Sequence, residues 1–279
     1  MNLKGHLLFL YLCMRRKPTL ILFLFCILSF AKLSAALDTC RLTNTSYASG
    51  EEIRFKIFYN VIGLYVDAGS AVFSVENIQL NNRPVYHVKG LGFSNPSYDW
   101  IFKVRDRYES FIDTSTLKPQ KFLRHVEEGG YRKDEAVIFN HTDKKAISTR
   151  GTYSIPDCIQ DVLSSIYFAR NIDFLKYQIG DKIPISMFLD DEVHSIYIRY
   201  LGKEVIKTKY GQFNAIKFKP MLIKGTIFQG GELMTVWVTD DANHLPLRIE
   251  SPITVGTVKV DMMGYKNLKN PMLALISLN

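Results

Sequence analysis

The histidines and glycines of this sequence do not fall at the spacings that mark common catalytic or cofactor sites. There is no G-x-S-x-G elbow, which argues against a hydrolase of that kind, and no G-x-G-x-x-G or Walker loop for a nucleotide. No two histidines show the H-E-x-x-H spacing of a zinc site; those after residue 36 are His87, His125, His141, His194 and His244. We therefore predict no catalytic, metal-ligating or cofactor-binding residue, and a protein that is not an enzyme, although acids distant in sequence could still converge.

Neighbouring carboxylates occur at several places, among them 127–128, 190–192 and 240–241. Adjacent residues in a strand point to opposite faces, so each pair is badly placed to share one substrate. Each cluster also falls where the sequence predicts a turn, which favours solvated turn residues. Asp241 and Asn243 could bind a cation weakly, but the remaining ligands of a calcium loop are absent.

Aromatic residues are the stronger candidates for a functional surface. We expect them to lie between a sheet and a helix, where core packing is the simpler interpretation and an apolar ligand pocket is the alternative. The candidate ligand-lining residues are Tyr98, Trp100, Phe102, Tyr167, Arg170 and Trp237, with Phe168 and Phe228 in the same space. Arg170 ends the predicted helix, where a cation favours the helix dipole; it either caps the helix, forms a salt bridge or contacts a ligand.

The elements that must position these residues are one helix and many strands. Residues 159–171 carry apolar side chains at helical spacing, and Asp157 with Gln160 is typical of a capping box. Alternation predicts strands over 53–59, 64–78 (with a bend near Gly69), 85–93, 107–113, 120–127, 131–140, 146–154, 182–189, 192–201, 203–208, 213–222, 233–239, 246–251 and 257–265. A lone amphipathic helix must bury its apolar stripe on the sheet. We predict a mainly β fold: a large curved antiparallel sheet or incomplete β-barrel with one main α-helix in its concave side.

The first 36 residues have the pattern of a secretory signal peptide. Arg15-Arg16-Lys17 precedes an apolar run, and Ser34-Ala35-Ala36 resembles a cleavage site. Met14 would begin a more ordinary signal peptide; the alternatives are an uncleaved anchor or, on a weak cysteine context, a lipoprotein. Removing residues 1–36 from the 279 leaves 243, which we interpret as a single all-β domain over 37–279, or two sheet halves joined by the helix at 157–172. No transmembrane span is expected in this mature chain.

Charge and cysteine content bear on the partners of the protein and on its cellular compartment. The net charge of +8 includes five basic residues and no acidic one from segment 1–36, so the rest carries +3. No Lys/Arg block exceeds two residues after residue 36, which argues against nucleic acid as a partner. Two of the four cysteines follow residue 36, Cys40 and Cys158. In an oxidising compartment they suggest a disulfide that would contribute about 4–5 kcal/mol in the chain-entropy model; separate buried thiols are the alternative.

Several short motifs follow one another in an order that resembles a known family. They are Gly50-Glu51-Glu52-Ile53, Ala68-Gly69-Ser70-Ala71, Asp106-Arg107-Tyr108-Glu109-Ser110, Asp161-Val162-Leu163-Ser164 leading to Tyr167 and Arg170, Gly180-Asp181-Lys182-Ile183-Pro184, Gly211-Gln212-Phe213, and Gly231-Glu232 through Trp237 to Leu245-Pro246. Together they resemble the exported bacterial family known as domain of unknown function 3108, in a Bacteroides-like version, over roughly residues 48–268. The resemblance implies an envelope protein of a Gram-negative bacterium and carries no catalytic residue.

A second, fold-level resemblance concerns Thr235 to Ile249. This segment is similar to a hairpin of periplasmic lipoprotein carriers, in which an incomplete barrel wraps a helix and holds acyl chains; fold alone does not fix function. Our first hypothesis is therefore an exported binding or chaperone-like module for an apolar or lipidic ligand, in the periplasm or at the periphery of the outer membrane. The alternative is a structural or assembly partner of another envelope protein, with a filled core and no small-molecule ligand.

Overall fold

The computed structural model describes residues 42–61, 63–224, 230–253 and 256–278, which belong to one compact unit, Thr39–Asn279. The predicted signal peptide, Cys40 and Phe228 lie outside the described residues, so the signal peptide and the disulfide stay predictions. Within the described ranges, no helix has both the length and the apolar character needed to cross a membrane.

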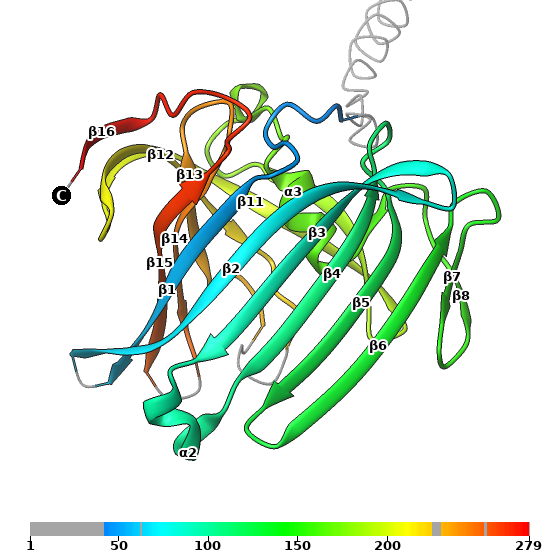
Figure 1. The fold of residues 1–279 in the computed structure, drawn as a ribbon. Helices are drawn as coiled ribbons and strands as arrows, with labels where there is room; N and C mark the ends of the chain where they lie inside the picture. The colour runs from blue at the N-terminus through cyan, green and yellow to red at the C-terminus, as the bar shows by residue number, and fades with distance from the viewer. Residues whose placement is uncertain (1–41, 62, 225–229, 254–255, 279) are drawn as a thin grey trace, which may run out of the picture. The chain divides into compact units, whose positions relative to one another are not determined.

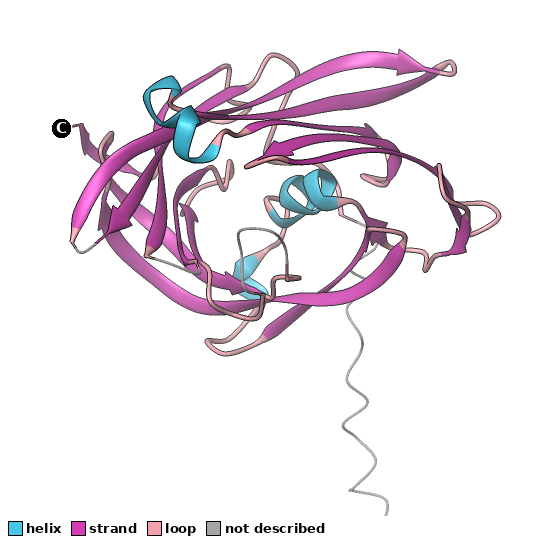
Figure 2. Cartoon of the chain, turned by 90° about the horizontal axis from the view of Figure 1, so that it is seen from below, coloured by secondary structure: helices cyan, strands magenta, loops and turns pink. Residues whose placement is uncertain are grey.

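Sixteen strands form one sheet around the helix α3 (Val162–Ala169), which lies inside the curve of the strands (Figures 1 and 2). The order along the sheet is β8-β7-β6-β5-β4-β3-β2-β1-β15-β14-β13-β12-β11-β10-β9, with β16 paired to β12. The strands are β1 (Glu52–Val61), β2 (Leu64–Leu80), β3 (Arg83–Ser94), β4 (Arg105–Asp113), β5 (Pro119–Glu128), β6 (Tyr131–Asn140), β7 (Lys145–Ser148), β8 (Thr152–Ser154), β9 (Ile159–Gln160), β10 (Lys182–Leu189), β11 (Glu192–Lys207), β12 (Gly211–Pro220), β13 (Thr235–Thr239), β14 (Pro246–Pro252), β15 (Thr257–Lys266) and β16 (Leu275–Leu278). The predicted fold class is confirmed, except that β9 and β10 run parallel, which makes the sheet mixed.

Two meanders, β1–β8 and β9–β15, join where β1 pairs with β15. The β10–β11 turn reaches back to the first meander: Asp190 contacts Arg124 and Lys133, and Asp191 accepts a hydrogen bond from Ser148 Oγ at 2.5 Å. Side chains therefore bridge the two meanders on the side where the sheet does not close.

Alternation of side chains decides which residues face the helix. In β1, Ile53 and Phe55 are buried while Arg54 and Lys56 lie on the other face. The bend predicted near Gly69 corresponds to a β-bulge, because Ile57 pairs with Gly69 and Phe58 with Asp67, which leaves Ala68 unpaired. A bulged strand bends and twists more strongly, which supports the curvature of the sheet.

The helix begins later than its apolar pattern predicts, and a different residue caps it. Ile159 and Gln160 form β9, and Asp161 is the N-cap, with its carboxylate accepting from Leu163 N at 2.8 Å and Ser164 N at 2.7 Å. Ser164 Oγ accepts from Asp161 N in return, which completes the capping box. The predicted box of Asp157 and Gln160 is wrong, because Asp157 is exposed and pairs with Lys144.

Helix α3 packs on the concave face of the sheet through Leu163 and Tyr167. Both belong to one core cluster with Val75, Val88 and Ile112 of β2, β3 and β4. Phe168 belongs to a second cluster with strands β10 to β13. The helix therefore joins the cores of both meanders. The short segments η2 (Pro96–Tyr98) and α2 (Asp99–Phe102) connect β3 to β4, and η3 (Phe174–Lys176) connects α3 to β10.

Candidate functional site: an apolar cavity beside helix α3

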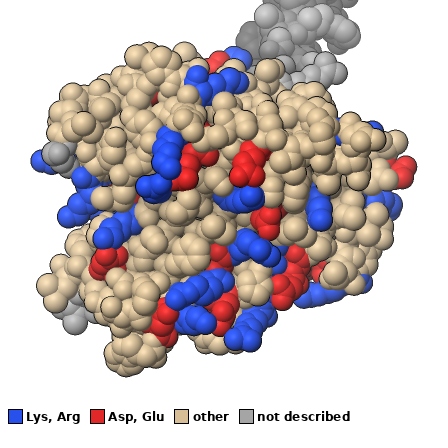
Figure 3. Space-filling model, in the orientation of Figure 1, with Lys and Arg blue, Asp and Glu red and all other residues tan. Residues whose placement is uncertain are grey.

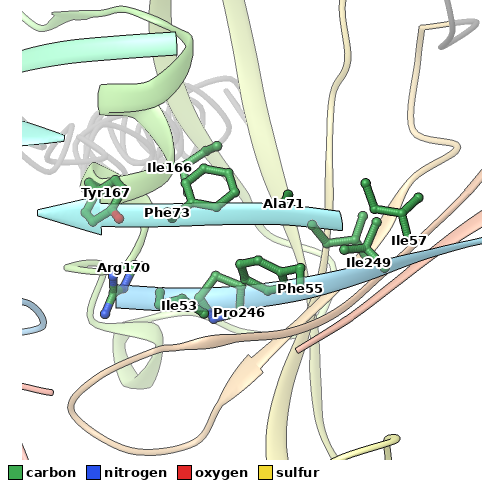
Figure 4. A pocket seen from close by; sticks show the side chains of 11 residues that line it. Ile53, Phe55, Ile57, Ala71, Phe73, Ile166, Tyr167, Arg170, Pro246 and Ile249 are labelled. Atoms are coloured by element: carbon green, nitrogen blue, oxygen red, sulfur yellow. The ribbon is translucent and has the colours of Figure 1, made fainter. Parts of the chain in front are cut away.

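An apolar cavity of about 220 Å³ lies between α3 and strands β1, β2, β14 and β15 (Figure 4). An engineered cavity of about 150 Å³ lined by Leu, Ile and Phe is large enough to bind benzene, so this space can admit an apolar group. The lining residues are Ile53, Phe55 and Ile57 of β1, Ala71 and Phe73 of β2, Ile166, Tyr167 and Arg170 at the helix, Pro246 and Ile249 of β14, and Val260 of β15.

Arg170 forms the charged end of this cavity, but its charge is compensated. Its Nη1 and Nη2 donate to the two carboxylate oxygens of Glu51 at 2.6 and 2.9 Å, and both side chains are almost completely buried. Nη2 also donates to Ser46 O at 3.2 Å and Nε to Asn243 O at 3.1 Å. Burial alone would lower the pKa of Arg170, yet the charge of Glu51 and the hydrogen bonds to its carboxylate raise it.

Two tyrosines pack beside Arg170 with their hydroxyls buried. The Tyr47 and Tyr167 rings meet edge to face at 4.9 Å, and the Arg170 guanidinium lies 5.2 Å from the Tyr167 centroid. Tyr47 Oη has no hydrogen-bond partner among the described residues, whereas Arg170 lies close enough to Tyr167 Oη to favour its ionised form. Burial raises the pKa of both phenols, so both stay protonated and can donate a hydrogen bond.

Two of the six candidate ligand-lining residues, Tyr167 and Arg170, lie on the cavity. Trp237 does not line it: the residue is buried in the core cluster of β1, β12 and β14, and its Nε1 donates to Glu204 at 2.6 Å. Tyr98, Trp100 and Phe102 also lie elsewhere, on η2 and α2 between β3 and β4.

The segment 98–102 does not lie between the sheet and α3, as was expected, but forms short helices between β3 and β4. Asn95 caps η2 by accepting from Ser97 N, and Pro96 follows it, so the chain turns into short helices in which alternate residues no longer share a face. Trp100 is 82 % exposed and its Nε1 donates to Ser97 O at 3.1 Å. The expectation that these three aromatics lie between sheet and helix is therefore wrong.

The acidic clusters at 190–192 and 240–241 lie at turns, as expected, but the prediction is wrong for Glu127 and Glu128, which end strand β5. Asp190 and Asp191 both have positive φ in the β10–β11 turn. Asp241 accepts hydrogen bonds from Thr239 Oγ1, Asn243 N, Leu273 N and Ala274 N, so its oxygens hold the chain and leave little for a cation. Over the described ranges, no group of three or more His, Cys, Asp or Glu side chains could hold a metal.

The carboxylate of Asp106 has a strongly raised pKa. Burial, and then the charge of Glu128, raises the pKa of Asp106 to about 7, while Asp106 Oδ1 accepts from Glu127 N at 3.1 Å. Because this pKa is higher in the folded state than in the unfolded chain, the folded protein binds the proton more tightly than the unfolded chain does. The resulting stability is present at low pH and is lost as pH rises through about 7.

Substituting Asp106→Asn should therefore change how stability depends on pH. Relative to the unsubstituted protein, the melting temperature of the variant should rise between pH 5 and pH 8, because Asn keeps the acceptor for Glu127 N and adds no charge. Thermal unfolding followed by circular dichroism at several pH values measures this difference. Asp143→Asn, at an exposed side chain that is hydrogen-bonded to the uncharged Asn140, is the control and should show no such trend. Parallel curves for Asp106→Asn and the unsubstituted protein would contradict the assignment.

The chain matches a protein family over most of its length. Residues 54–263 match the model of the family described as protein of unknown function, DUF3108. The chain belongs to this family. The resemblance that the motifs indicated is thereby confirmed, and it brings no catalytic role to any residue of the DUF3108 chain. No curated protein matches the chain.

One solved structure supports the fold of this DUF3108 chain, and two others are similar at a lower TM-score. A beta-barrel-like protein of domain of unknown function DUF1849 from Brucella abortus is 8 % identical, with a TM-score of 0.52 over 81 % of this chain and 100 % of that one. A Bacteroides fragilis protein described as exported with a YmcC-like fold gives 11 % identity, a TM-score of 0.30 and coverage of 81 % and 100 %. A Parabacteroides distasonis protein described as a putative lipoprotein is 13 % identical, with a TM-score of 0.36 over 81 % of this chain and 99 % of that one.

Proposed function

We propose that this DUF3108 protein is an exported binding module that holds an apolar or lipidic group in the cavity beside α3. The observation that supports the proposal is the cavity itself, which is lined by side chains of four strands and one helix and is almost entirely apolar. The side chains that line such a cavity lack contacts that they would make in a filled core, and an apolar ligand would supply those contacts. The signal-like segment 1–36 supports export to the periplasm or the periphery of the outer membrane.

A cavity-filling substitution tests this proposal. Ala71→Phe places a ring in the cavity that Ala71 lines. The affinity for the neutral apolar dye N-phenyl-1-naphthylamine should then fall at least about tenfold. A loss of this size is expected when a few apolar contacts worth ~1.4 kcal/mol disappear. Dye fluorescence during titration measures the affinity. Ala71→Leu serves as a smaller replacement if the Phe variant does not fold.

The matched control is Ala136→Phe on the outer face of β6, where the neighbouring Glu135 and Val137 face inward and are buried. This variant should bind the dye as the unsubstituted protein does. Failure of the unsubstituted protein to bind dye, together with no lipid in native mass spectra of protein purified from its own cells, would remove the proposal. Unchanged dye binding by both Ala71 variants would place the site elsewhere.

A second candidate function, assembly with an envelope protein, has one observation in its favour. Trp100, Ile101 and Phe102 are 82 %, 62 % and 45 % exposed on α2, far more than apolar side chains usually are when they serve only packing. A photo-crosslinker introduced at Ile101 should then give one defined protein adduct in cells, and Trp100→Ala should abolish it. Adducts that persist in the Trp100→Ala background, or no adduct at all, would contradict a specific partner.

The surroundings of α2 do not point to nucleic acid. Acidic and basic side chains are interspersed over the face shown in Figure 3. Several of them pair across strands or along the chain, including Lys103 with Glu127 at 3.1 Å and Arg105 with Asp99 at 2.6 Å. A phosphate backbone is bound by unpaired cations gathered on one surface, which this face does not offer.

A further inference from the structure

The surface of the cavity beside α3 is apolar even at the end where Tyr167 and Arg170 border it. The Arg170 guanidinium is engaged by four hydrogen bonds, two to Glu51, one to Ser46 O and one to Asn243 O. The Tyr167 hydroxyl interacts with the same guanidinium. The polar atoms at this end are therefore occupied by one another, and a polar group of a ligand would lose its hydration there without gaining a partner.

The cavity is long and narrow. Ile53, Phe55 and Ile57 line it from alternate positions of β1, so it follows that strand for about 13 Å at the usual rise per residue. Spread over this length, the volume of about 220 Å³ gives a mean cross-section of roughly 17 Å². Figure 4 shows Tyr167 and Arg170 at one end of the cavity and Ile57 at the other. Such a space accepts one alkyl chain along the strand and is too narrow for two chains side by side.

The two ends of the cavity differ in their access to solvent. Ile53 and Tyr167, at one end, are 2 % and 1 % exposed. Ile57 and Ile249, at the other end, are half-buried, and Ile166 on the helix side is 38 % exposed. Solvent therefore reaches the cavity at the Ile57 end and along Ile166, whereas the end formed by Ile53 and Tyr167 is closed.

We propose that the cavity takes one straight alkyl chain, with its methyl end against Ile53 and Tyr167 and its polar group in solvent beyond Ile57. This inference rests on the proposed function and specifies the ligand class. By proportion to the cavity of about 150 Å³ that holds the six carbons of benzene, this one holds about nine carbons. The polar group stays hydrated, so neutral and anionic amphiphiles of one chain length bind alike.

A series of alkyl maltosides tests the depth of the cavity. Hexyl, octyl, decyl and dodecyl maltoside are titrated into the full chain by calorimetry at pH 7.5, below their micelle concentrations. The affinity should rise about fourfold for each added methylene until the cavity is full, at about nine carbons, and dodecyl should then bind no more tightly than decyl maltoside. At physiological ionic strength, decyl sulfate should bind as tightly as decyl maltoside, because its charged group remains in screened solvent.

Ala71→Leu narrows the middle of the cavity and should shorten the chain that it accepts. In this variant the affinity should stop rising at a shorter chain, and decyl maltoside should bind at least about tenfold more weakly than to the unsubstituted protein. Ala136→Leu on the outer face of β6 is the matched control and should leave the whole series unchanged.

The outcomes separate this inference from the proposed function. An affinity that keeps rising up to dodecyl maltoside, or a difference of about tenfold or more between decyl sulfate and decyl maltoside, overturns the inference while the binding function stands. An unchanged series in a folded Ala71→Leu variant does so as well. If that variant does not fold, the series on the unsubstituted protein decides. If none of the maltosides binds the unsubstituted protein, the binding function itself fails.

Discussion

Replacing Arg170 with methionine is expected to lower the free energy of unfolding by about 3–5 kcal/mol. The substitution leaves Glu51 with a buried charge and no cation, since both side chains are at most 2 % exposed. It also removes the donors that bind Ser46 O and Asn243 O, which tie the segment before β1 and the β13–β14 turn to the helix. Urea denaturation followed by tryptophan fluorescence gives the free energy directly.

Two further variants separate charge burial from the loss of an ordinary salt bridge. Arg199→Met breaks the ion pair with Glu232, in which the side chains are 30 % and 26 % exposed, and should destabilise the protein far less than Arg170→Met does. Combining Arg170→Met with Glu51→Gln removes both charges and should recover part of the loss. The interpretation fails if Arg170→Met and Arg199→Met destabilise the protein equally, or if the double variant is no more stable than Arg170→Met alone.

The strands could be predicted because their signal is local. Ile53 and Phe55 alternate with Arg54 and Lys56, and such alternation matches one buried face wherever the strand lies in the sheet. β11 shows the limit of this signal: it runs through Gly202, where the sequence predicts a break, because Gly202 adopts a positive φ at a β-bulge.

The helix start could not be predicted because tertiary pairing decides it. Ile159 fits the apolar stripe of a helix, but it pairs with Ser186 in a parallel ladder, and this partner lies far along the chain.

The candidate site could not be predicted for the same reason. Glu51 and Arg170 are 119 residues apart, and nothing local to either indicates that the start of β1 lies beside the end of α3. The cavity arises from that same juxtaposition of strands and helix.

Leu163→Ala is expected to have the second large effect, a loss of about 2–5 kcal/mol in the free energy of unfolding. Leu163 is 2 % exposed and packs in the cluster with Val75, Val88 and Ile112, where removing three carbons leaves a cavity that neighbouring strands cannot collapse into. Its Cδ1 comes within 3.5 Å of where a Cβ would lie on Gly90, so the strand below has no side chain to fill the space.

Ile166→Ala is the matched control on the same helix. The helical pattern places Leu163 and Ile166 on one buried face, yet Ile166 is 38 % exposed and borders the cavity beside α3 rather than the closed core. Its truncation should cost about 1 kcal/mol or less, since it leaves no closed void and alanine favours the helix. Urea denaturation of both variants measures the contrast. If the two substitutions cost the same, the cavity beside Ile166 is closed in solution and the space proposed for a ligand is ordinary core.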